Sequence, residues 1–172
     1  PPQCLIDLMK DNFAMTNGYR KKINNLSQPS GAVVFYGAIN RSSFPDNSPS
    51  HFQLSSKEFG SIFISISIDG DGRAPLGQAT LIASIFVDIQ DWNSLTKENY
   101  QLKKSKFICL IRKELDGYFN LDSTDWFHQE LSTPRSFFKW TGRPDGIVGG
   151  LGQYISNFGP FGLPSRTPLK GL

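Results

Sequence analysis

Residues 61–69, "SIFISISID", alternate isoleucine with small or aromatic residues and decide the fold. Successive side chains of a strand point to opposite faces, so this stretch predicts a strand with two different faces. One face carries Ile62, Ile64, Ile66 and Ile68, and the other carries Ser61, Phe63, Ser65 and Ser67. Residues 78–89, "QATLIASIFVDI", repeat the pattern after a connection rich in Gly and Pro. The two stretches therefore predict an antiparallel pair.

Three further strands and two helices complete this expectation. Residues 32–39, 51–56 and 126–132 are predicted strands. Residues 91–119 contain a predicted helix that begins at a cap, Ser94 or Thr96, and ends at Gly117. Its apolar stripe should pack on the isoleucine face. The stripe consists of Tyr100, Phe107, Ile108, Ile111 and Leu115.

A second helix is predicted to begin at Thr133 and Pro134, residues 1–26 are predicted to be mostly helical, and the chain beyond residue 143 is predicted to be mainly loop. The predicted class is α+β, a mixed and largely antiparallel sheet with helices on one face.

Composition restricts the classes of function. The chain has 172 residues, which fits one domain, and its formal net charge is only +3. No stripe of basic and aromatic residues suggests nucleic acid as a partner. Cys4 and Cys109 do not form a disulfide framework and share no zinc-ligand spacing with a histidine, so we expect a reducing, cytoplasmic compartment and no metal. The apolar stretches are too short to span a bilayer.

Two stretches partly match known phosphate-binding and calcium-binding motifs, but each lacks residues that the motif requires. Residues 146–153, "GIVGGLGQ", lack the Lys-Ser/Thr and the strand-turn-helix unit of a phosphate loop. Residues 69–73, "DGDGR", lack the glutamate of a calcium loop, because Thr80 occupies that position. His128 and Glu130 share a strand face, either as substrate contacts or as a structural pair. The catalytic residues are therefore unknown.

The face opposite the isoleucines mixes small and aromatic side chains, a combination that lines apolar-ligand pockets. Its predicted substrate-binding residues are Phe63, Ser65, Ser67, Ser84 and Phe86, joined by Phe35 or Tyr36. The alternative is a face covered by other protein or by water. If helices cover it, the site is expected at Trp140 and around Phe158 and Phe161 instead.

Three longer stretches carry a resemblance to a known family. They are residues 70–86, "GDGRAPLGQATLIASIF", residues 128–153, "HQELSTPRSFFKWTGRPDGIVGGLGQ", and residues 158–172, "FGPFGLPSRTPLKGL". Together they resemble the later part of the phytoene-desaturase and carotenoid-isomerase family of FAD-dependent oxidoreductases. The carotenoid 3',4'-desaturase type is the most similar.

The resemblance implies a polyene-binding fragment of a larger flavoenzyme, in a flavin amine-oxidase-like fold. Residues 1–172 would form the substrate domain and be inactive alone, with no cofactor-binding residues. FAD would bind the parent through segments outside the chain, namely a Gly-rich fingerprint and the Gly-Asp pair that follows "RTPLKGL" in the family. The parent would be a carotenoid desaturase or a redox-neutral isomerase. The alternative from another functional class is an independent carrier of apolar ligands that does not use flavin.

A substrate drawn from lipid also implies a peripheral membrane contact. The basic residues Arg143, Arg166 and Lys170 are the expected headgroup contacts. A solvated surface is the alternative interpretation of these charges.

Overall fold

A computed structural model describes residues 2–8, 17–26, 30–45, 47–152, 154–164 and 167. Its centre is a five-stranded sheet in the order β2-β3-β4-β1-β5, and each neighbouring pair is antiparallel. The strands are β1 (Gly31–Asn40), β2 (His51–Ser56), β3 (Gly60–Ile66), β4 (Gln78–Val87) and β5 (Trp126–Ser132). The predicted α+β class and all five predicted strands are confirmed.

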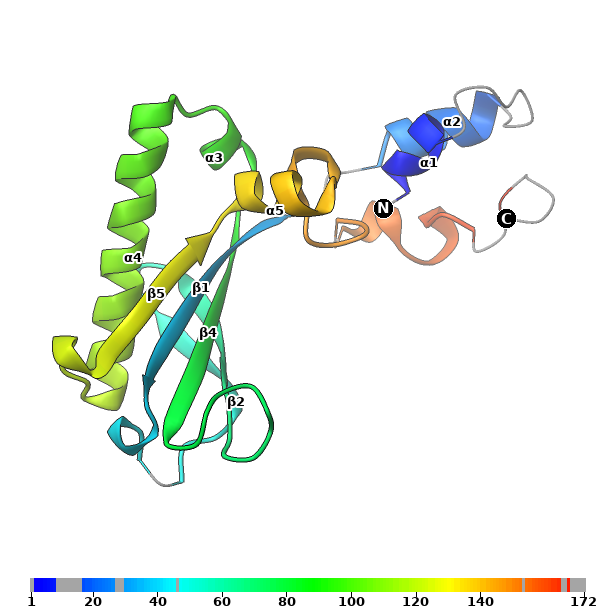
Figure 1. The fold of residues 1–172 in the computed structure, drawn as a ribbon. Coiled ribbons are helices and arrows are strands. Elements are labelled where there is room, and N and C mark those ends of the chain that lie inside the picture. The colour runs from blue at the N-terminus through cyan, green and yellow to red at the C-terminus, as the bar shows by residue number, and fades with distance from the viewer. Residues whose placement is uncertain are drawn as a thin grey trace.

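Helices lie beside the sheet and beyond one end of it (Figure 1). The long helix runs along the sheet, and a short helix at the end of β5 leads away from it. The helices are α1 (Gln3–Leu8), α2 (Asn17–Asn24), α3 (Gln90–Asn93), α4 (Lys97–Phe119) and α5 (Pro134–Thr141). Short 3-10 turns occupy the segment after α5, at Pro144–Gly146, Ile155–Asn157 and Gly159–Phe161, which agrees with the predicted loop.

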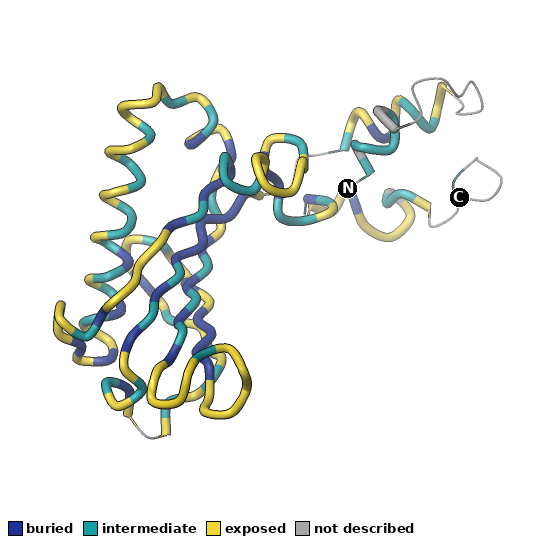
Figure 2. The backbone as a smooth tube through the Cα atoms, viewed as in Figure 1, coloured by how far each residue is buried: buried dark blue, intermediate teal, exposed yellow. Residues whose placement is uncertain are grey.

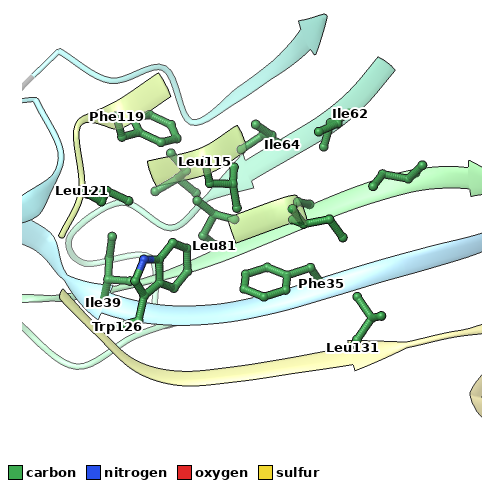
Figure 3. Close-up of a cluster of buried hydrophobic side chains, with 14 of the residues drawn as sticks. Phe35, Ile39, Ile62, Ile64, Leu81, Leu115, Phe119, Leu121, Trp126 and Leu131 are labelled. Carbon is green, nitrogen blue, oxygen red and sulfur yellow. The ribbon is translucent and has the colours of Figure 1, made fainter. Parts of the chain in front are cut away.

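The core lies between the sheet and α4 (Figure 3). Ile62, Ile64 and Ile66 are fully buried, and so are Ile111 and Leu115 of α4. This packing confirms that the helix covers the isoleucine face. Hydrophobic burial of this kind contributes roughly 1.5–3 kcal/mol for each large aliphatic side chain.

Phe35 belongs to this core. It pairs with Ala83, a core residue of β4, and its ring makes an edge contact with Trp126 at 5.5 Å between centroids. Gly37 lies next along the same face, and a Cβ there would overlap the Trp126 ring. Phe35 therefore does not join the opposite face, which Tyr36 does.

Two predicted ends are corrected. Gly117 lies inside α4, and Asn120 takes the left-handed conformation at its end, with φ 56°. Asn adopts the left-handed region more readily than most residues. The helix therefore ends at Asn120, about one turn beyond Gly117. Strand β3 ends at Ile66, and Ile68 is 52% exposed and not part of the isoleucine face. The predicted caps at Thr96 and Thr133 are confirmed.

Replacing Ile111 with Asp should unfold the domain, because an unpaired carboxylate would be buried between α4 and the sheet. We expect a loss of more than about 4 kcal/mol in the free energy of unfolding measured by urea titration with circular dichroism. The matched control is Leu102→Asp on the same helix, where the side chain is 69% exposed. Similar unfolding curves for the two variants would contradict the assigned core.

Candidate ligand-binding face

The second face of the sheet carries half of the residues predicted to bind substrate, namely Tyr36, Phe63, Ser65, Ser84 and Phe86. Cross-strand register places Phe63 opposite Ser84, and Ser84 opposite Val34. The next row joins Ser65, Ile82 and Tyr36. These side chains thus meet across three strands, although they come from distant parts of the sequence.

This face is partly open in the described part of the chain. Phe63 is 45% exposed and Phe86 is 79% exposed, Tyr36, Ile82 and Ser84 are half-buried, and Val34 and Ser65 are buried. Figure 2 shows the buried segments concentrated in the strands, while the loop between β3 and β4 is exposed. No second layer of helices packs on this face among the described residues. The alternative site at Trp140 and around Phe158 and Phe161, expected only if helices covered the face, is therefore not required.

Ser67 lies beyond the strand and is only 1% exposed. Its Oγ accepts a hydrogen bond from the backbone N–H of Thr80 at 2.9 Å. The hydroxyl therefore holds β3 to β4 and does not line the open face. The sequence predicts Ser67 on that face because the alternation of residue types continues past Ile66, where the strand itself ends.

A polar cluster closes one end of the open face. Arg73 Nη1 donates to Ser65 Oγ at 3.2 Å, and the same Oγ lies 3.0 Å from His51 Nε2. A guanidinium group only donates, so Ser65 Oγ is the acceptor of the Arg73 hydrogen bond. The other ring nitrogen of His51, Nδ1, lies 3.1 Å from Ser50 Oγ. A chain of polar contacts thus runs from Arg73 through Ser65 and His51 to Ser50.

Asp71 holds Arg73 in this position. Its carboxylate accepts from Arg73 Nε at 2.7 Å and from the backbone N–H groups of Arg73 and Ile68, both at 2.8 Å. These bonds, with the Arg73 backbone N–H first, lower the pKa of Asp71 to about 2. Gly70 and Gly72 adopt φ angles of 84° and 76°, so this segment is the tight connection that the glycines predict.

A cavity of about 500 Å³ lies at the other end of the open face. Phe86 belongs both to the face and to the cavity wall. The lining also includes Tyr154, which lies about seventy residues further along the chain. The full lining is Ser30, Phe86, Val87, Asp88, Ile89, Gln90 and Tyr154.

The remaining predicted site residues lie away from the face. Trp140 is on α5 and is 77% exposed, and Phe158 follows in the C-terminal segment at 49% exposed. The side chain of Phe161 lies outside the described residues. His128 and Glu130 are exposed on the same side of the sheet as Tyr36, because they pair with Ala38 and Tyr36.

Sequence reasoning did not assign His51, Arg73, Ile82 or Tyr154 to the site. His51 and Ser65 meet only through the register of β2 with β3, and no local motif encodes that register. Ile82 is placed on the right face by its alternation with Leu81 and Ala83, and that signal is sufficient to include it.

The Gly-rich segment and the helix starts make contacts within the chain. Gly146, in the Gly-rich segment, packs against the backbone of Pro134, so that glycine serves close packing. The first turns of α4 and α5 are capped by Thr96 and Thr133. Within the described ranges, no group of His, Cys, Asp or Glu is arranged to hold a metal ion, and no helix is long and apolar enough to cross a membrane.

Comparison with known proteins finds a similar protein of named function. No family model matches the chain. The chain is 30% identical over 138 residues to "Prolycopene isomerase, chloroplastic" of Arabidopsis thaliana. The alignment covers 74% of this chain and 23% of the relative, so the chain spans less than a quarter of the relative's length. This similarity agrees with the family resemblance and does not separate isomerases from desaturases.

The Asp71 pKa provides a test of the polar cluster. A carboxyl group whose pKa falls from 3.8 to about 2 on folding contributes stability above pH 3.8, and this contribution is lost as the pH falls through about 2. We expect NMR titration of the carboxyl carbon to place Asp71 below the other aspartates. Arg73→Ala should raise this pKa only in part, because the backbone donors remain. An unshifted Asp71 would show that the connection is not held as described.

Proposed function

We propose that the chain is the polyene-binding domain of a carotenoid-modifying enzyme, and that its open sheet face forms one wall of the substrate site. The similarity to a prolycopene isomerase over 74% of the chain carries this proposal. The wall would consist of Tyr36, Phe63, Ile82, Ser84 and Phe86, with the polar cluster at one end and the cavity at the other.

Physical chemistry supports a polyene on this face. A polyene has few polar groups, so its binding depends on apolar area and shape. At roughly 25 cal/mol per Å² of buried apolar surface, about 200 Å² of contact supplies about 5 kcal/mol without any charged residue. Small residues such as Ser84 leave room between the rings of Phe63 and Tyr36, and the chain direction of β4 gives the elongated path such a ligand needs.

The proposed reaction of the whole enzyme is redox-neutral isomerisation, because the relative carries that name. Carotenoid desaturation is the second candidate, favoured by the three sequence stretches that resemble desaturases. In either case the FAD that the resemblance implies would bind through residues outside those described, and the present chain would supply substrate contacts.

We further propose that the enzyme collects its substrate at a membrane surface. Phe138 and Trp140 of α5 are 57% and 77% exposed, and Lys139 Nζ lies 4.7 Å from the centroid of the Trp140 ring. Exposed aromatic residues beside cations suit the headgroup region of a bilayer. Arg143 follows directly after this helix, while Arg166 and Lys170 lie outside the described residues.

Filling the open face should block polyene binding. Ser84→Trp places a large ring between Phe63 and Val34, and we expect at least about tenfold weaker binding of lycopene isomers delivered from detergent micelles. Ser84 is preferable to Ser65, because Ser65 is bonded to His51 and Arg73 and its replacement would also disturb the fold.

The control for this experiment is Ser123→Trp, an exposed position in the 3-10 turn Ser123–Asp125, away from the face. Bound carotenoid is measured by absorbance after gel filtration, and stability by thermal unfolding. Equal carotenoid binding by both variants would rule out this face as the substrate wall. Absence of carotenoid binding by the unaltered chain would overturn the proposed function itself.

Removing both exposed rings of α5 should weaken membrane association. We expect Phe138→Ala with Trp140→Ala to reduce flotation with anionic liposomes several-fold, since each ring buries apolar area at the interface. Leu76→Ala is the control, because Leu76 is 90% exposed in the distant connection between β3 and β4. Unchanged flotation of the double variant would exclude α5 as the contact.

A further inference from the structure

Strand β5 ends the sheet on one side. It pairs with β1, and no strand within the described residues pairs with its other side. Phe127 is 51% exposed, and the next three residues are exposed as well. An edge strand presents a row of N–H and C=O groups that can pair with another strand.

A depression of about 620 Å³ lies directly beside this edge, between β5 and α4. Gln129 forms its strand side, and Arg112 joins the two elements by donating to Gln129 Oε1 at 3.1 Å. The charge of Arg112 is paired within the chain, because its Nη2 lies 3.1 Å from Asp116 Oδ2. Ile108 and Cys109 supply apolar surface on the helix side.

The polar side chains along β5 are self-complementary. In an antiparallel pair of β5 strands centred on Gln129, His128 stands opposite Glu130 of the partner subunit, and the two-fold axis repeats this pair. Both side chains are exposed, and neither makes a hydrogen bond or ion pair within the described residues. A hydrogen-bonding side chain that faces a carboxylate across strands stabilises such a pair, and like charges facing each other destabilise it.

From these three features we infer that β5 is a self-association edge, and that its occupant is β5 of a second copy of this chain. The two sheets become one continuous antiparallel sheet. Because the two-fold axis is perpendicular to that sheet, the two α4 helices lie on the same side and meet at the depression. Cys109 of one copy then lies near Cys109 of the partner subunit.

Charge reversal tests the strand pairing. His128→Glu places a carboxylate opposite Glu130 at both symmetry-related positions of the strand pair. Glu130→Lys removes the acid that faces His128. Each variant alone should dimerise at least about tenfold more weakly than the unaltered chain in sedimentation velocity, since two cross-strand pairs change sign or are lost. An equimolar mixture of the two variants should recover the dimer, because the carboxylate introduced at position 128 of one chain then faces the ammonium group introduced at position 130 of the other.

Recovery in the mixture also demonstrates that both variants are folded. A second measurement uses Cys109 in a Cys4→Ser background, where a short bismaleimide should form covalent dimers of the unaltered β5 and few of the Glu130→Lys variant. A chain that is monomeric over the whole concentration range would overturn the inference. Dimers that are insensitive to both substitutions would overturn it as well, because the interface would then lie elsewhere.

Discussion

The contact between the isoleucine face of the sheet and α4 is the interaction on which the rest of the structure depends. Ile62, Ile64 and Ile66 alternate along β3, and Ile111 and Leu115 recur one turn apart on α4, so two different periods meet at one interface. The register of β3, β4 and β1 is fixed by this contact, because a shift of one residue would turn every aliphatic side chain away from the helix.

Because the isoleucine face supplies the core, the residues of the opposite face are not needed for core packing and are available for contact with a ligand. Phe63 and Phe86 remain exposed there although burial would stabilise them, and Ser84 is smaller than its cross-strand neighbours Phe63 and Val34. Both ends of this face carry polar groups. Arg73, held by Asp71, lies at one end, and the cavity at the Phe86 end is lined in part by Asp88 and Gln90. In the proposed site, the apolar contacts would therefore lie between two polar ends.

The sequence predicts those parts of the molecule in which one local signal is strong. Strict alternation identifies β3 and β4, and Thr96 identifies the start of α4. In β1 both faces are apolar, so alternation does not separate Phe35 from Tyr36, and only the pairing with β4 decides that Phe35 is core. The link from His51 through Ser65 to Arg73 depends on strand register and on the path of a loop, which local patterns do not encode.

The edge strand and the open face are connected through geometry. His128 and Glu130 point to the same side of the sheet as Tyr36, because they pair with Ala38 and Tyr36 of β1. A two-fold axis perpendicular to the sheet leaves the open faces of both copies on one side. The proposed pairing would therefore join two ligand-binding faces into one broad surface, with a line of His-Glu pairs between them. Apolar ligands on the two copies would then be separated by a polar boundary, which keeps each polyene on its own sheet.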